Sequence, residues 1–164
     1  GIEVLARELD RVARKPAPVS VLMFDLDDFK SINDQHGHLV GDQVLSEVGR
    51  RIRQLLRGSD TKCRYGGDEF LVILPETPAE GAAHVADWLR QELSALTIEV
   101  GGLQLSVRAS FGVATTEQRL DVNEVIRRAD TALYDAKRAG RNCVRSFAPR
   151  QMLPDRRVPS SAVM

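Results

Sequence analysis

Two pairs of adjacent glycines, Gly66-Gly67 and Gly101-Gly102, constrain the fold of this chain more than any other feature. The first pair separates two strand-like segments, 61–65 and 69–74, and the second lies within a strand-like stretch at 97–113. We interpret both as β-hairpins, because paired glycines supply the positive φ angles that tight hairpin turns need. Strands joined by such a turn are antiparallel, so the sheet cannot be wholly parallel.

Helical periodicity alternates with these strands along the chain. The spacing of apolar residues predicts helices at 2–15, 29–33, 40–57, 78–95 and 122–139, with further strands at 18–25 and 143–147. Proline ends the first of these helices, and glycine follows the third and the fifth. The order predicts an α/β (α+β) fold in which helices flank a mixed, mainly antiparallel central sheet.

Length and composition favour a single domain. A chain of 164 residues with 43% hydrophobic side chains can bury one core, which we place at 1–147, and the arginine- and proline-containing stretch at 148–164 reads as a flexible tail. The 23 basic and 23 acidic residues cancel, which disfavours nucleic acid as a partner. No apolar run approaches the roughly 20 residues of a bilayer span, and two cysteines without Cys-x-x-Cys spacing fit a reducing cytoplasm.

Two acidic clusters lie where strands are predicted to end. Asp25, Asp27 and Asp28 follow the first strand, and Asp68 and Glu69 lie on the first hairpin turn. If the two strands are neighbours, the carboxylates repel one another unless a hard cation such as Mg²⁺ lies between them. Either cluster alone is better explained as a helix cap or a solvated turn, and the metal hypothesis is preferred only because the two occur together.

Glycines and cations near these clusters favour a phosphate ligand. Gly66 and Gly67 leave backbone N–H groups uncovered, so that a triphosphate could approach the main chain. Lys30 lies one turn beyond Asp28, and Lys137 and Arg141 are four residues apart at the end of the last helix. The last two also fit a simpler role, since cations at a helix C-terminus complement its macrodipole.

Together these segments resemble one known family, the GGDEF domains, which are diguanylate cyclases. The resemblance runs from the first helix to about Phe147. It rests on Asp25-Leu26-Asp27-Asp28-Phe29-Lys30, Ile32-Asn33-Asp34, Gly37-His38, Gly41-Asp42, Arg64-Tyr65-Gly66-Gly67-Asp68-Glu69-Phe70, Ser110-Phe111-Gly112-Val113, Ala129-Asp130, Lys137 and Gly140-Arg141-Asn142. The family's usual segment before the first helix, Asp-x-Leu-Thr-x-Leu-x-Asn-Arg, is not in this sequence.

The resemblance implies a fold similar to the nucleotidyl cyclase and polymerase palm, and an enzyme that condenses two GTP into cyclic di-GMP and two pyrophosphates. Two copies of the domain face each other, each holding one GTP. Mg²⁺, with Mn²⁺ as the alternative, would be bound by Asp25, the Leu26 carbonyl, Asp68 and Glu69. Such domains are bacterial and cytoplasmic, and the full-length protein can be tethered to a membrane by preceding sensory modules.

The remaining roles come from the same resemblance. Asp68, Glu69 and Lys30 would be catalytic, and the general base is either Asp68 or a metal-bound hydroxide. The substrate would be bound by Asn33, His38, Asp42, Gly66, Gly67, Lys137 and Arg141, with Asn33 and Asp42 reading guanine.

Arg57, Asp60 and Arg64 match the family's inhibitory site for cyclic di-GMP. Outside this context Arg57-Gly58-Ser59-Asp60 would read as a helix end followed by a turn. The family's further arginine is expected on the helix after the hairpin, where this chain has His84 and Trp88, with Arg90 nearby. One rival function is a GTP- or cyclic di-GMP-binding module without turnover, whose usual mark is the loss of Asp25, Asp68 or Glu69. A second is a polymerase palm, which the net-neutral charge of the chain disfavours.

Overall fold

The computed structural model describes residues 1–148, so the predicted tail lies, apart from Ala148, outside the described residues. The helices are α1 (Ile2–Arg14), α2 (Phe29–His36), α3 (His38–Leu55), α4 (Ala79–Ser94) and α5 (Val122–Arg138). The strands are β1 (Val19–Leu26), β2 (Thr61–Gly66), β3 (Glu69–Leu74), β4 (Thr97–Val100), β5 (Leu103–Ser106), β6 (Ala109–Thr116) and β7 (Val144–Ser146). Within residues 1–148 no helix combines the length and the apolar character that a bilayer span needs.

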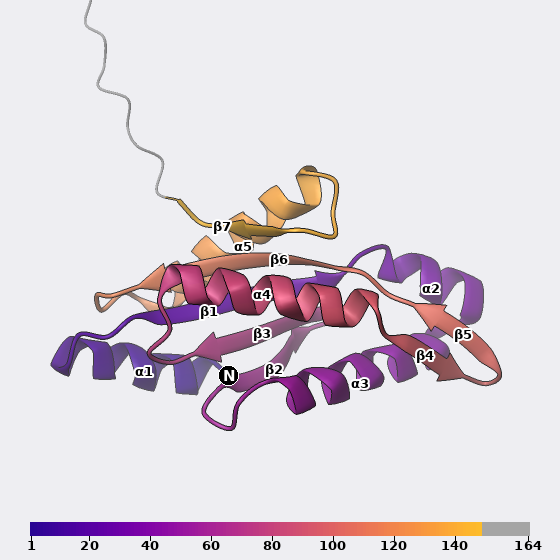
Figure 1. Cartoon of the computed structure of the whole chain (residues 1–164), viewed down its shortest axis with the longest axis horizontal. Coiled ribbons are helices and arrows are strands. Elements are labelled where there is room, and N and C mark those ends of the chain that lie inside the picture. The colour runs from indigo at the N-terminus through magenta and orange to yellow at the C-terminus, as the bar shows by residue number, and fades with distance from the viewer. Residues whose placement is uncertain (149–164) are drawn as a thin grey trace, which may run out of the picture.

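Five strands form the central sheet in the order β2-β3-β1-β6-β7 (Figure 1). β1 is the middle strand and is antiparallel to both β3 and β6, whereas β7 is parallel to β6. The predicted mixed, mainly antiparallel sheet is therefore confirmed.

Helices cover both faces of this sheet, and β1 contributes to two cores. Leu22, Phe24 and Leu26 pack with residues of α3 and α4, while Val21 and Met23 pack with residues of α1 and α5. Because side chains alternate along a strand, Asp25 faces the same side as Val21 and Met23. A strand buried at every position has no free face, which explains its continuous apolar sequence.

The second glycine pair corrects one prediction. Instead of two strands over 97–113, there are three, because β4 and β5 form a separate two-stranded sheet and β6 joins the central one. Gly101 and Gly102 do have positive φ angles, of 56° and 80°, and they close the β4–β5 hairpin as predicted. The two sheets are separated by the break at 107–108, a change of direction that an apolar pattern alone does not mark.

At the first glycine pair the hairpin is confirmed, but the reason given for its glycines is wrong. β2 and β3 pair as expected, with a register shift between Arg64 and Gly66. Neither Gly66 nor Gly67 has a positive φ angle. The backbone at this turn therefore does not itself require glycine.

Candidate active site

The register of the central sheet brings the two acidic clusters together. β1 pairs with β3 so that Asp25 lies directly opposite Glu69, and Asp68 precedes Glu69 on the turn. Directly opposed residues on neighbouring strands have their side chains on the same face, so these carboxylates share one edge of the sheet. Asp25 belongs to β1 itself and is only 5% exposed.

Burial leaves the Asp25 carboxyl incompletely satisfied. Its Oδ1 atom has no hydrogen-bond partner within residues 1–148, while Oδ2 forms an ion pair with Lys137. Burial raises the pKa of Asp25 to about 6, against the opposing effect of Lys137, and the nearby charges of Asp68 and Asp27 raise it further. A buried carboxylate oxygen without a partner is costly, and a divalent cation would remove that cost.

Lys137 responds to the same group of carboxylates. Its own partial burial lowers its pKa, but the bond to Asp25 and the charges of Asp68 and Glu69 outweigh that effect and raise the pKa overall. Lys137 is therefore a permanent cation at the acidic edge of the sheet.

The chain does not form a complete metal cage by its side chains alone. In the part that the structure describes, no three His, Cys, Asp or Glu side chains converge closely enough to hold an ion. A metal held at Asp25 would therefore also need main-chain oxygen, such as the Leu26 carbonyl, and oxygens of a ligand.

The other predicted cations lie around this edge. Arg141 follows α5, and its Nε atom is 3.8 Å from Asp28 Oδ1. Lys30 is exposed in the first turn of α2. The fold thus brings Lys137 and Arg141, which are more than 100 residues from β1 in sequence, to the end of that strand.

The residues predicted to read a base lie on α2 and α3. Asn33 is half-buried on α2, and His38 and Asp42 are exposed in the first turns of α3. A Cβ atom at Gly41 would lie 1.8 Å from Asn33 Oδ1, so the two helices approach closely only because residue 41 is glycine. The buried Asn33 Oδ1 has no hydrogen-bond partner within residues 1–148, which costs roughly 1–3 kcal/mol in a residue with only a structural role.

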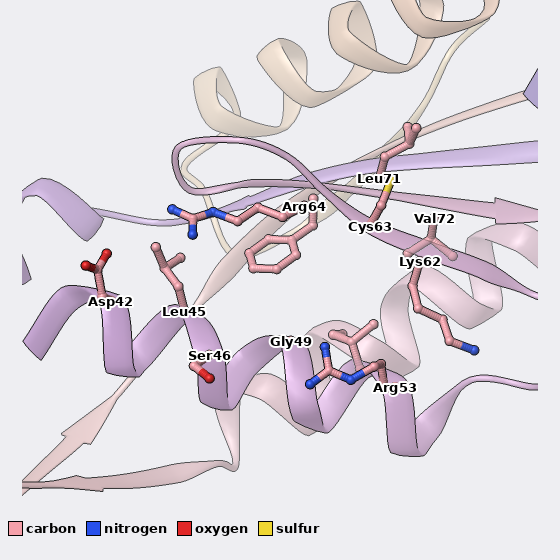
Figure 2. Close-up of a pocket in the computed structure, with 12 residues that line it drawn as sticks. Asp42, Leu45, Ser46, Gly49, Arg53, Lys62, Cys63, Arg64, Leu71 and Val72 are labelled. Atoms are coloured by element: carbon pink, nitrogen blue, oxygen red, sulfur yellow. The ribbon is translucent and has the colours of Figure 1, made fainter. Parts of the chain in front are cut away.

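A groove of about 260 Å³ runs between α3 and the β2–β3 hairpin (Figure 2). Asp42 lies at one end of this groove, and Arg53 and Lys62 lie at the other. Sequence analysis missed it, because its two walls come from separate elements whose distance is set by core packing. Arg64 points toward the Asp42 end, where its Nε donates to the Gly67 carbonyl at 2.7 Å.

The residues proposed for inhibition are not all brought together. Arg57 and Asp60 form one turn, in which the Arg57 N–H donates to Asp60 Oδ2 at 3.0 Å and the Asp60 N–H donates to the Arg57 carbonyl at 3.1 Å. Lys62 also donates to that carbonyl, whereas Arg64 points to the opposite end of the groove. The Arg57 guanidinium makes no hydrogen bond or ion pair to any residue in 1–148.

On α4, Trp88 is 41% exposed and His84 lies one turn before it. Arg90 is engaged elsewhere, since it pairs with Asp87 and contacts Asn142. Arg90, the arginine that could complete an inhibitory site from α4, is therefore already paired within the chain.

Comparisons with known proteins show the family and the fold of this chain. The family model described as "Diguanylate cyclase, GGDEF domain" matches residues 2–143. Diguanylate cyclase A of Treponema denticola is 42% identical over 131 residues, and the response regulator PleD of Caulobacter vibrioides is 43% identical over 130 residues. These matches cover 79% and 77% of this chain but only 35% and 29% of the two relatives.

Solved structures of similar domains share the fold. Diguanylate cyclase SiaD of Pseudomonas aeruginosa, solved with its activator SiaC, superposes with a TM-score of 0.85 at 39% identity, covering 88% of this chain and 56% of that one. The GGDEF domain of DgcB from Caulobacter crescentus, solved with cyclic di-GMP, gives 0.84 at 31% identity, covering 88% and 84%.

The agreement of a family model over nearly all described residues with relatives above 40% identity confirms the resemblance seen in the motifs. This chain belongs to the GGDEF domain family of diguanylate cyclases.

Proposed function

We propose that this chain, with residues 1–147 as one domain, condenses two GTP into cyclic di-GMP and two pyrophosphates. The observation that carries the proposal is the pairing of Asp25 with Glu69 across β1 and β3, beside a buried carboxylate oxygen that lacks a partner. Relatives named diguanylate cyclases support it. We place the reaction in the cytoplasm of a bacterial cell.

The acidic edge would hold the divalent cation. Asp25, Asp68, Glu69 and the Leu26 carbonyl are its ligands in this proposal, with Mg²⁺ as the ion and Mn²⁺ as the alternative. When bound, the cation neutralises the triphosphate and lowers the pKa of the attacking 3′-hydroxyl.

The chain's own residues would do the rest of the chemistry. Each 3′-oxygen would attack an α-phosphorus as the bond to pyrophosphate breaks, and Asp68 would accept the hydroxyl proton. Lys30, Lys137 and Arg141 stabilise the charge that develops on the transferred and leaving groups. Lys137 pairs with Asp25 in the structure, so binding of a metal would release it toward phosphate oxygens.

The glycine turn supports close approach of the phosphates. A Cβ atom at Gly67 would meet no other group within 4 Å, and at Gly66 it would meet only Glu69, at 3.5 Å. Neither residue has a positive φ angle, so the fold of the chain gives no reason for glycine here. A ligand that lies against the main chain would give one.

Guanine would be read between α2 and α3. Asp42 would accept hydrogen bonds from the N1–H and amino groups of the base, with Asn33 and His38 beside it. Adenine presents the wrong donors and acceptors to this set, so it would cover Asp42 and Asn33 without pairing with them and would be rejected.

The reaction needs a second copy of the chain, because each half-site holds one GTP. Product binding at Arg57 and Asp60 would inhibit the enzyme, and Arg64 contributes there only if it leaves the Gly67 carbonyl. The solved DgcB domain has cyclic di-GMP bound, which supports a product site in domains of this kind.

One assay tests the proposal. The chain is incubated with GTP and Mg²⁺ over a wide range of protein concentrations, with and without a fused dimerisation helix, and cyclic di-GMP and pyrophosphate are measured. The rate per molecule should rise with concentration and become constant in the fusion, and Asp25→Asn should remove product. GTP binding without product in either form would instead show a binding module, and Mn²⁺ in place of Mg²⁺ tests the choice of metal.

A further inference from the structure

The turn between α5 and β7 has an unfavourable backbone conformation. Gly140, Arg141 and Asn142 have successive φ angles of 111°, 64° and 45°, all in the left-handed region. Only the first of these residues adopts that region freely. Interactions elsewhere must hold Arg141 and Asn142 in place.

The Arg141 N–H donates to the Ala136 carbonyl of α5 at 3.2 Å, and Asp27 holds the Asn142 end of the turn. The Asp27 Oδ2 atom accepts a hydrogen bond from the Asn142 backbone N–H at 2.9 Å, and its Oδ1 accepts one from the Ser110 hydroxyl at 2.6 Å. The Ser110 Oγ also accepts from the same Asn142 N–H, at 3.1 Å. Ser110 is fully buried at the start of β6, so this connection joins the end of β1, the start of β6 and the turn after α5.

The turn is also held from its other side. The Asn142 Oδ1 atom accepts from Arg90 and from Ser94, each at 3.3 Å, and both of these residues lie on α4. Arg141 extends from the middle of the turn toward Asp28, at the acidic edge. Its position depends on two anchors, the bond from its own N–H to α5 and the contacts that hold Asn142 after it.

These contacts distinguish Asp27 from Asp25, although the two acids are only two residues apart. Both oxygens of Asp27 accept hydrogen bonds within the chain, whereas Asp25 keeps one buried oxygen without a partner in residues 1–148. Unlike Asp25, Asp27 therefore has a hydrogen-bond partner within the described chain for each of its oxygens.

We propose that Asp27 is a positioning residue which, through Ser110 and the Asn142 backbone, holds the left-handed turn at 140–142 and so places the Arg141 guanidinium where it contacts substrate phosphate. The inference rests on the proposed function, because it assigns Arg141 to the phosphates of GTP. The rival explanation is that Asp27 only stabilises the fold, with no effect on the ligand.

Four variants and a control separate these explanations. Asp27→Asn has the same shape but replaces one acceptor by a donor, and Ser110→Ala removes the bridging hydroxyl without touching Asp27. Arg141→Ala and the double variant Asp27→Asn/Arg141→Ala complete a cycle. Asp135→Asn is the matched control, because Asp135 is an exposed acid on α5.

Affinities for GTP and for guanosine are measured with Mg²⁺ by calorimetry, and hydrogen exchange is followed over 139–144. Asp27→Asn and Ser110→Ala should speed exchange there and weaken GTP binding by about tenfold, the scale of one charge-assisted contact, while leaving guanosine binding unchanged. The double variant should bind GTP no more weakly than Arg141→Ala alone. The control should match the wild type in both measurements.

The possible failures are distinguishable. A wild-type chain that binds no GTP overturns the proposed function and, with it, the role of Asp27. If the wild type binds GTP normally, two results overturn the positioning role alone. One is a loss of GTP affinity in the double variant equal to the sum of the two single losses. The other is an equal loss of affinity for GTP and for guanosine in Asp27→Asn and Ser110→Ala. Exchange that is unchanged in both Asp27→Asn and Ser110→Ala shows that the turn is held without Asp27, which also overturns it.

Discussion

Asp25 shows at the scale of one residue how a functional group differs from a structural one. Its neighbours on β1 are apolar and fully buried, yet this carboxyl is buried with one oxygen unpaired. Burying a carboxylate oxygen without a hydrogen-bond partner lowers the free energy of unfolding, so the Asp25 Oδ1 atom does not stabilise the fold. This cost to stability gives the first prediction.

We expect Asp25→Asn to remove a pH dependence from folding. Burial raises the pKa of Asp25 to about 6 from an ordinary value of 3.8, so the folded chain binds this proton more tightly than the unfolded chain does. The wild type should therefore lose on the order of 2–3 kcal/mol of unfolding free energy relative to Asp25→Asn as the pH rises from 4 to 7 without metal. Urea denaturation at several pH values measures the difference.

Saturating Mg²⁺ should restore part of this loss above pH 6 in the wild type and not in the variant. Asp135→Asn serves as the control, because that acid is exposed. Parallel curves for wild type and Asp25→Asn between pH 4 and 7 would show that Asp25 does not titrate in this range.

Gly67 gives a second prediction at the residue scale. Its surroundings leave room for a methyl group and its φ angle is not left-handed, so Gly67→Ala should change the unfolding free energy by less than about 0.5 kcal/mol. If phosphate approaches the main chain there, the same change should reduce cyclic di-GMP production by roughly tenfold or more.

Gly102→Ala should show the opposite behaviour at the β4–β5 hairpin turn, which contains none of the proposed site residues. Gly102 has a φ angle of 80°, so alanine should destabilise the fold while leaving the activity per folded molecule unchanged. Full activity of Gly67→Ala would contradict the close approach of phosphate to the main chain at this residue.

At the scale of elements, the position of α5 depends on one glycine in β6. A Cβ atom at Gly112 would lie 2.2 Å from both the Ala129 carbonyl oxygen and the Leu133 nitrogen, which are backbone atoms of α5. This close approach sets the helix against the sheet. Lys137 extends from the last turn of that helix to Asp25.

Gly112→Ala should therefore displace α5, destabilise the fold by at least about 1–3 kcal/mol and impair activity in the remaining folded protein. Denaturant unfolding and the product assay measure the two effects. Gly49→Ala is the matched control: its Cβ would only contact Arg53 at 3.5 Å and Phe70 at 3.8 Å, within a helix, so it should stabilise by about 0.5–1 kcal/mol. Similar stability for both variants would mean that the contact between α5 and β6 relaxes easily.

The elements themselves were largely predictable. All five helices and the first hairpin follow from periodicity and glycine, because a helix or hairpin is specified by residues close in sequence. The separation of β4–β5 from β6 was not predictable, since it depends on which strand each segment pairs with. Pairing partners come from distant parts of the chain.

At the scale of the whole molecule, activity and inhibition are proposed at separate places on one domain. The turn of Arg57 and Asp60 follows α3, whereas the acidic edge lies at the end of β1. Cyclic di-GMP bound at the Arg57–Asp60 turn can affect the acidic edge only by changing how two copies assemble or how the elements of one copy are placed.

We expect Arg57→Ala to relieve product inhibition without changing the initial rate. Losing a charge-assisted arginine contact should raise the cyclic di-GMP concentration that gives half inhibition by at least about tenfold. Progress curves with added product measure this. Arg53→Ala is the control, as an exposed arginine in the last turn of α3, just before Arg57, and inhibition that is unchanged in Arg57→Ala would count against the site.

By itself, the sequence determined the fold class, the elements and the family, because these depend on local periodicity and on motifs whose spacing is written in the chain. It also singled out Asp25, Asp68 and Glu69 as a group. Only the tertiary structure decided which residues meet. It placed Asp25 opposite Glu69, bonded one oxygen of Asp27 to Asn142 and the other to Ser110, and directed Arg64 away from Arg57. The physical reason is that strand register and helix packing are set by cores from remote segments, and one step of register changes every neighbour of a side chain.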